Sequence, residues 1–173
     1  MRVESDSDFE TCLLGSLPKL RAFAVALSGN QDTAADLVQE TIVRALENEE
    51  SFRGDAPIGP WLFVILRNVY LNNLRKHKRE TSFDADTFEN RLVFEPEQPV
   101  RTDLNDVNSA MIKLSPKHRE AMNLVVFEEL SYVEASEISG CAIGTIKSRL
   151  NRARKLVGEM VSPETLQCSL QSA

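Results

Sequence analysis

The stretch LSYVEASEISGCAIGTIKSRLNRARKL, from Leu130 to Leu156, restricts the fold of this chain more than any other part of the sequence. Ser131 and Glu134 match the S-x-x-E capping box that begins a helix, and Gly140 with Cys141 supplies a tight turn after it. The helix that follows carries apolar residues at spacings of three and four: Ile143, Ile146, Leu150, Ala153 and Val157. Two short helices around a tight turn predict a helix-turn-helix.

The other face of the second helix is polar and basic. If its apolar residues face inward, four side chains face outward together: Thr145, Ser148, Arg149 and Arg152. A hydroxyl can contact a base or a phosphate, and an arginine can bind guanine O6 and N7 with two hydrogen bonds. Lys147, Arg154 and Lys155 are better placed for phosphates, which position a protein without specifying a sequence. This pattern favours DNA binding over the plain alternative, a solvated basic helix in a structural bundle.

The rest of the chain has the same helical character. Apolar residues recur at helical spacing and runs of β-branched residues are short, so the sequence predicts an all-α fold. We expect a first small helical domain over residues 1–80, a second over residues 104–161 that holds the helix-turn-helix, and a tail over residues 162–173. Residues 81–103 are rich in acidic side chains and predict a flexible acidic linker, either a loosely packed loop or a segment that folds on a partner.

The first domain begins with two predicted helices. One starts near Leu17 and ends at Gly29, and its buried face is expected to hold Leu20, Phe23, Ala24 and Leu27. Asn30 or Asp32 is the candidate N-cap of the next helix. Its predicted buried stripe consists of Ala35, Val38, Ile42 and Ala45. Its opposite face presents Asp36, Gln39, Glu40 and Arg44.

A third helix follows the loop SFRGDAPIG, and Pro60 suits its first turn. Residues 61–66 are almost entirely apolar, which predicts that the first turns are buried. A polar stripe follows at spacings of four, three and four: Asn68, Asn72, Arg75 and Arg79. Asparagine amides can contact base edges, and the loop before Trp61 could hold an extruded base.

The second domain begins with a predicted helix whose inward residues are Leu104, Val107, Met111 and Leu114. Ser115 is the expected N-cap of the helix that follows, and Pro116 its first residue.

Composition excludes several classes of protein. The chain has 173 residues and a formal net charge of -6, and no apolar run approaches the roughly 20 residues of a membrane span. The N-terminus has no signal-peptide pattern. The cysteines of the chain (Cys12, Cys141, Cys168) and its histidines (His77, His118) are too scattered along the sequence for a zinc site or a disulfide framework. We therefore expect a soluble cytoplasmic protein with no cofactor and no metal, and we find no catalytic constellation.

Several segments, in order along the chain, resemble one family. DLVQETIVRAL, SFRGDAPIGPWLFVILRNVYLNNLRK, the acidic linker and the segment from Leu114 to Leu156 are similar to the extracytoplasmic-function (ECF) sigma factors of the sigma-70 family. These are two-domain bacterial transcription initiation factors without a catalytic site. The segments LSGNQDTAADLVQET and GCAIGTIKSRLNRAR are similar to the subgroup that drives the general stress response in alphaproteobacteria.

The resemblance implies roles for individual positions. The surface that grips the β′ clamp helices of core RNA polymerase would consist of Asp36, Gln39, Glu40 and Arg44. The site that melts and holds the minus-ten element would use Phe52, Arg53, Trp61, Asn68, Asn72 and Arg75. The helix that reads the minus-thirty-five element would use Thr145, Lys147, Ser148, Arg149 and Arg152.

The resemblance also implies partners. They are promoter DNA, core RNA polymerase through its β′ clamp helices and β flap, and an anti-sigma factor. The linker would pass through the RNA exit region of the polymerase.

Two other functions stay open at this point. One is a non-initiating, sigma-like mimic that binds an anti-sigma factor instead of promoters. The other is a stand-alone helix-turn-helix regulator, which would leave the first domain unexplained.

Overall fold

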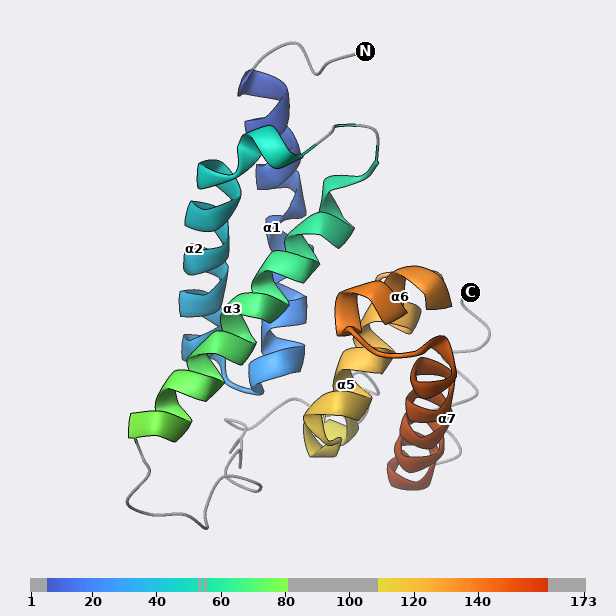
Figure 1. Cartoon of the computed structure of the whole chain (residues 1–173). Helices are drawn as coiled ribbons and strands as arrows, with labels where there is room; N and C mark the ends of the chain where they lie inside the picture. The colour runs from blue at the N-terminus through green and yellow to red at the C-terminus, as the bar shows by residue number, and fades with distance from the viewer. Residues whose placement is uncertain (1–5, 53, 55, 81–108, 162–173) are drawn as a thin grey trace, which may run out of the picture. The chain divides into compact units, whose positions relative to one another are not determined.

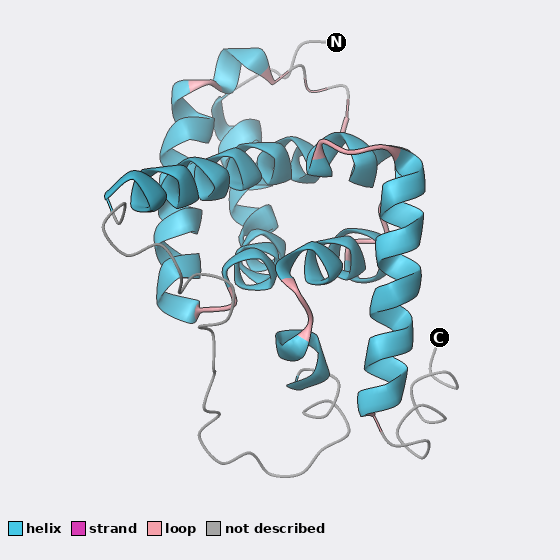
Figure 2. Ribbon diagram, turned by 60° about the horizontal axis from the view of Figure 1, so that its bottom comes forward, coloured by secondary structure: helices cyan, strands magenta, loops and turns pink. Residues whose placement is uncertain are grey.

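The computed structural model describes residues 6–52, 54, 56–80 and 109–161. Helices joined by turns and loops account for all of these residues, and none of them forms a strand, as Figure 2 shows. The prediction of an all-α fold is therefore confirmed. The predicted linker over residues 81–103, the tail over residues 162–173 and the predicted inward residues Leu104 and Val107 lie outside the described residues.

The chain divides into two compact units, each with its own core. The first unit contains α1 (Asp6–Ser28), α2 (Gln31–Glu47), the short 3₁₀ helix η1 (Glu49–Ser51) and α3 (Ile58–Glu80). Each of the three long helices packs against the other two, and α3 crosses the α1–α2 pair (Figure 1). The side chains that fill the space between them are fully buried: Leu20, Phe23, Leu37, Leu62, Leu66 and Val69.

The turn between α1 and α2 follows from its sequence. Gly29 has φ 69°, a left-handed conformation that ends α1 without the clash a side chain would cause. Asn30 is the N-cap of α2, and its Oδ1 accepts a hydrogen bond from the Thr33 backbone N–H at 2.9 Å. Of the two candidate caps, Asn30 is therefore the one used.

The first unit differs from the sequence prediction in three places. α1 begins eleven residues before Leu17 and carries Pro18 in its interior. The buried residues of α2 are Ala34, Leu37, Thr41 and Ala45, whereas the predicted Ala35, Val38 and Ile42 are only half-buried. Val64, within the apolar run of α3, is exposed. Because α2 packs on both α1 and α3, its contact surface is broad and is centred on Leu37, one position away from the predicted stripe.

The second unit contains a helical segment that ends at residue 113, then α5 (Pro116–Met122), α6 (Tyr132–Ser139) and α7 (Ile143–Met160). α5 continues as a π-helical turn, η2 (Asn123–Phe127). α7 packs against both α5 and α6. The core of this unit joins the segment before α5 to α7: Ala110, Met111, Leu114, Met122, Leu150, Ala153, Val157 and Val161.

The predicted helix-turn-helix is present. Ser131 and Glu134 form both hydrogen bonds of the capping box at the start of α6. Gly140 ends α6 in the left-handed conformation, with φ 57° and ψ 39°. The prediction that Ile143 belongs to the core stripe of α7 is wrong, because this side chain is 39% exposed. It is the first residue of α7, so no earlier turn of that helix covers it.

Candidate nucleic-acid interface

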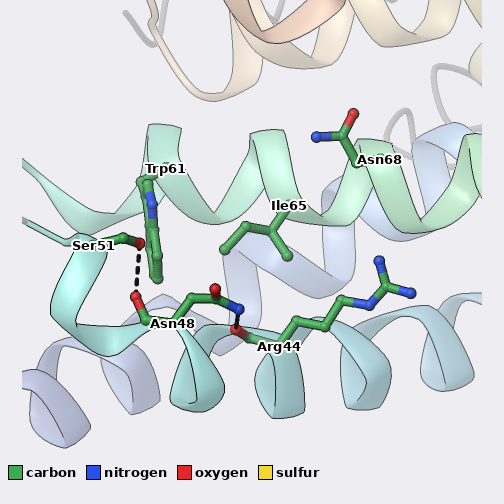
Figure 3. A pocket seen from close by; sticks show the side chains of 6 residues that line it. All are labelled: Arg44, Asn48, Ser51, Trp61, Ile65 and Asn68. Carbon is green, nitrogen blue, oxygen red and sulfur yellow. Dashed lines mark hydrogen bonds between the residues drawn. The ribbon is translucent and has the colours of Figure 1, made fainter.

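A pocket of about 290 Å³ opens on the first unit, between the end of α2, η1 and α3. Six side chains line it: Arg44, Asn48, Ser51, Trp61, Ile65 and Asn68. Figure 3 shows the indole of Trp61 and the side chain of Ile65 reaching from α3 toward α2, while the amide of Asn68 points away from α2.

Local hydrogen bonds fix the α2 side of this pocket. Asn48 Nδ2 donates to the Arg44 carbonyl at 2.8 Å, and Ser51 Oγ donates to the Asn48 carbonyl at 2.7 Å (Figure 3). These contacts hold the chain as it leaves α2 and enters η1. The walls therefore combine an indole and an aliphatic side chain with amide, hydroxyl and guanidinium groups. Flat apolar surface next to hydrogen-bonding groups suits an unstacked base.

Three aromatic rings meet beside the pocket. The Phe52 and Trp61 ring centroids are 5.4 Å apart. Phe9, from the first turns of α1, lies 6.0 Å from Phe52 and 6.2 Å from Trp61, measured between centroids. Phe52 and Trp61 were predicted as site residues, and the structure brings them together. Arg53 lies outside the described residues.

The polar stripe of α3 is on the surface. Asn68, Asn72, Arg75 and Arg79 are all exposed. Arg75 Nη1 lies 3.4 Å from Asn72 Oδ1, a long hydrogen bond between neighbouring turns. The stripe therefore extends from the pocket toward the basic end of the helix.

The predicted polymerase-binding residues lie along α2. Asp36 and Gln39 are exposed, while Glu40 and Arg44 are half-buried and form an ion pair of 2.6 Å. Glu40 Oε2 also accepts a hydrogen bond from Asn73 Nδ2 of α3 at 3.3 Å. Because Arg44 lines the pocket, it lies beside residues predicted for minus-ten DNA, a proximity that the sequence did not indicate.

The outward face of α7 contains the five predicted minus-thirty-five residues. Lys147, Ser148 and Arg152 are exposed, while Thr145 and Arg149 are half-buried. Lys147 Nζ lies 5.4 Å from the centre of the Tyr132 ring, a cation–π distance that joins α6 to α7. Arg149 is tied to the turn, because its Nη1 lies 3.5 Å from Cys141 Sγ.

A histidine from α5 faces the same arginines. His118 is half-buried, and burial lowers its pKa below the usual 6.5. The positive charges of Arg152 and Arg149 lower the pKa of His118 further. Both effects favour the neutral form of the imidazole, which lies beside α7.

The sequence prediction missed five residues at these sites: Asn48, Ser51, Ile65, Phe9 and His118. Helical spacing could have found two of them, because Asn48 follows Arg44 by one turn and Ile65 lies on the same face as Trp61 and Asn68. Phe9 and His118 come from other helices, and only the fold brings them close.

The described residues offer neither a metal site nor a membrane-spanning helix. They contain no group of three or more histidine, cysteine, aspartate or glutamate side chains placed to hold a metal ion. Among those same residues, no helix is both long and apolar enough to cross a membrane.

Family profiles match both units. Residues 15–80 match Sigma-70 region 2, and residues 104–157 match Sigma-70, region 4. Among curated proteins, the chain is similar to the ECF RNA polymerase sigma factor EcfG of Rhodopseudomonas palustris, with 45% identity over 86% of this chain and 82% of that protein. It is also similar to the RNA polymerase sigma factor SigV of Bacillus subtilis, with 32% identity over 90% of this chain and 92% of that protein.

A solved structure is similar along most of its length. The sigma factor RpoE of Bartonella quintana, crystallised with the anti-sigma factor NepR, has 42% sequence identity to this chain and a TM-score of 0.75. The likeness covers 88% of this chain and 96% of that one.

Proposed function

Because the chain belongs to the ECF sigma factors of the sigma-70 family, we propose that it directs core RNA polymerase to promoters by holding two DNA elements, one with each unit. The observation that carries the proposal is the pocket on the first unit, which continues into an exposed stripe of amides and guanidiniums on α3. A stand-alone helix-turn-helix regulator would have no use for this second DNA-binding surface.

The first unit would hold the opened minus-ten strand. An unpaired base stacks on an aromatic ring whatever its identity, and amide groups can then read its edge. Trp61 supplies the ring, Asn68 stands at the rim, and Arg44 lines the α2 side of the pocket. Asn72 and Arg75, further along the exposed stripe, are placed to follow the strand away from the pocket.

The second unit would read the minus-thirty-five element as a duplex. α7 follows the turn at Gly140, and its buried stripe packs against α5 and α6, which leaves the opposite face turned outward. Arg149 and Arg152 are the candidates for base edges, with Thr145 and Ser148 as hydroxyl contacts. Lys147, held over Tyr132, is better oriented for a phosphate.

Core polymerase would bind along α2, where Asp36 and Gln39 are exposed on the surface opposite the core. The β′ clamp helices are the proposed contact for this surface, and the β flap for the second unit. The chain needs no catalytic residue in this role, because the polymerase performs the chemistry. A protein that works with RNA polymerase acts in the cytoplasm.

We further propose that an anti-sigma protein controls this chain during a stress response. The support is that the similar RpoE chain was crystallised with the anti-sigma factor NepR. The alternative, a mimic that only binds such a protein, predicts intact anti-sigma binding without any transcription.

Reconstituted transcription tests the proposal. Purified chain and core polymerase are incubated with genomic fragments, and the transcripts are mapped. We expect initiation at fragments that share two spaced elements, and no specific transcript from core polymerase alone. Binding to core polymerase without any initiation would favour the mimic, and tight specific DNA binding without polymerase would favour a stand-alone regulator.

A further inference from the structure

We infer that Phe9 is a positioning residue for the minus-ten site, because its ring packs against both Phe52 and Trp61. The inference deepens the proposed function and rests on it. Phe9 lies before residue 15, where the match to Sigma-70 region 2 begins. The first turns of α1 would therefore be part of the promoter-melting apparatus of this chain.

The geometry of the three rings supports this role. Phe9 is only 3% exposed, so its ring is enclosed by its neighbours. It meets Trp61 edge-on, with an interplanar angle of 72°, and Phe52 at a tilt of 54°. Edge-to-face and tilted arrangements are the preferred geometries of aromatic pairs.

Two of the three rings, Phe52 and Trp61, lie at the two ends of one loop, so their packing on Phe9 affects that loop. Phe52 ends η1, and its backbone N–H bonds to the Glu49 carbonyl at 2.9 Å. Trp61 lies in the first turn of α3, four residues after the last loop residue, Pro57. The segment between the two rings is the loop before Trp61, which the sequence suggests as the place for an extruded base. Phe9 contacts the ring on each side of this loop, so it holds both ends of the loop against α1.

Trp61 depends on such support because it lines the pocket while remaining half-exposed. A side chain that is open to solvent on one face keeps a single orientation only if its other face is packed. Phe52 and Phe9 provide that packing. Removing the Phe9 ring would leave the indole with one aromatic neighbour in place of two, so the pocket wall would lose its fixed position.

Two variants and one control separate positioning from ordinary core packing. Phe9→Leu keeps a buried apolar side chain but removes the ring, and Phe9→Ala is the stronger lesion. Leu13→Ala is the matched control, because Leu13 is also buried, lies one turn later in α1 and is outside the ring cluster. All variants are compared at a temperature at which circular dichroism shows each of them to be folded.

Trp61 itself provides the first measurement, since it is the single tryptophan of the chain. We expect both Phe9 variants to shift Trp61 emission to longer wavelength and to increase its quenching by acrylamide. Leu13→Ala should leave both properties as in the wild type. A shift of the same size in Leu13→Ala, or no shift in the Phe9 variants, would overturn the inference.

Holoenzyme binding provides the second measurement. The probe is fork-junction DNA that carries the minus-ten strand of a promoter found by the transcription assay. We expect Phe9→Leu to weaken binding of this probe by about three- to tenfold, the range of roughly 0.7 to 1.4 kcal/mol. Affinity for core polymerase should stay at the wild-type value.

Equal losses of affinity for core polymerase and for the probe would mean that Phe9 only stabilises the first unit. That result would overturn the inference about Phe9 but not the proposed function. Unchanged probe binding in both Phe9 variants would have the same meaning. Failure of the wild-type holoenzyme to bind the probe would overturn the proposed function, and this inference with it.

Discussion

Single residues link surfaces that the sequence separates. Glu40 lies on the predicted polymerase face of α2, yet its carboxylate binds Arg44 at the pocket and Asn73 on α3. The two side chains of this ion pair are 38% and 37% exposed, so the pair contributes little to folding stability. Its larger effect is to hold the Arg44 guanidinium in place. If the proposed roles of α2 and the pocket hold, polymerase binding and strand capture would meet at this carboxylate.

Replacement of Glu40 by alanine tests this link, with Asp36→Ala as the control on the same face. Both substitutions should lower the affinity for core polymerase, because both remove a carboxylate from the predicted contact surface. Only Glu40→Ala should also weaken binding of fork-junction DNA by holoenzyme assembled at saturating chain concentration. Identical DNA binding by the two variants would show that Glu40 does not act through Arg44.

His118 predicts a dependence of stability on pH. Its pKa in the folded unit is lowered by burial first, then by Arg152 and Arg149. The unfolded chain, with a pKa near 6.5, therefore takes up a proton more readily than the folded chain as the pH falls through this value. Protonation then favours the unfolded state, so stability is complete above pH 6.5 and is lost progressively below it.

Denaturant unfolding of the wild type and of His118→Gln at about pH 7.5 and about pH 5.5 measures this effect. The wild type should lose more of its free energy of unfolding on acidification than the variant loses. His77, the other histidine, is exposed and present in both proteins, so it cancels in the comparison. Parallel losses in the two proteins would exclude His118 as the source.

At the level of single helices, the sequence was sufficient to predict features that depend on residues close together in the chain. The capping box at Ser131 and the tight turn at Gly140 are as predicted, and Asn30 is one of the two candidate caps for α2. Each depends on backbone geometry and on residues that lie within a few positions of one another in the sequence. The α7 core residues from Ile146 to Val157 were predicted for the same kind of reason, since spacing alone defines a helical face.

Features that depend on several helices at once were not predictable. The centre of the buried face of α2 depends on where α1 and α3 lie, so the predicted stripe missed Ala34, Leu37 and Thr41. The predicted helix start near Leu17 was wrong, because packing of Phe9 and Leu13 extends α1 through Pro18. The pocket unites Arg44 with Trp61, and spacing along the sequence cannot predict that contact.

Ser131→Ala measures how much the capping box contributes to the second unit. Ser131 Oγ accepts from the Glu134 backbone N–H at 3.2 Å, and the Ser131 N–H donates to Glu134 Oε2 at 2.8 Å. Loss of the hydroxyl should lower the free energy of unfolding by about 1 kcal/mol. The control is Ser136→Ala, since Ser136 lies within α6 and its hydroxyl bonds only to the Val133 carbonyl of the preceding turn.

Unfolding midpoints in urea, converted to free energies, compare the two variants. Ser136→Ala should be close to the wild type, because alanine favours the helix interior. Equal destabilisation by the two substitutions would show that the hydroxyl of Ser131 stabilises the second unit no more than a serine hydroxyl inside the helix does.

At the scale of the whole molecule, the charge distribution explains how an acidic chain can act on DNA. The sequence has 26 acidic and 20 basic side chains, so its overall field repels the phosphate backbone. Positive charge is gathered instead at the end of α3 and along α7. Each basic surface is small, so neither unit should bind DNA tightly alone. Two surfaces held on one polymerase would bind it together, because the second contact forms at high effective concentration.

Each unit is proposed to read its own promoter element, and transcription from a promoter library randomised at both elements can separate the two contributions. Wild-type holoenzyme is compared with Asn68→Ala, Arg149→Ala and the control Arg154→Ala, which changes a neighbouring arginine on α7. Arg149→Ala should flatten base preference at the minus-thirty-five element by ~1–3 kcal/mol, the value of one bidentate base contact, and leave the minus-ten preference intact. Asn68→Ala should flatten base preference at the minus-ten element and leave the minus-thirty-five preference intact. Arg154→Ala should lower the amount of transcript without changing either preference. Loss of preference at both elements in each variant, or at neither, would show that the two units do not read separate elements.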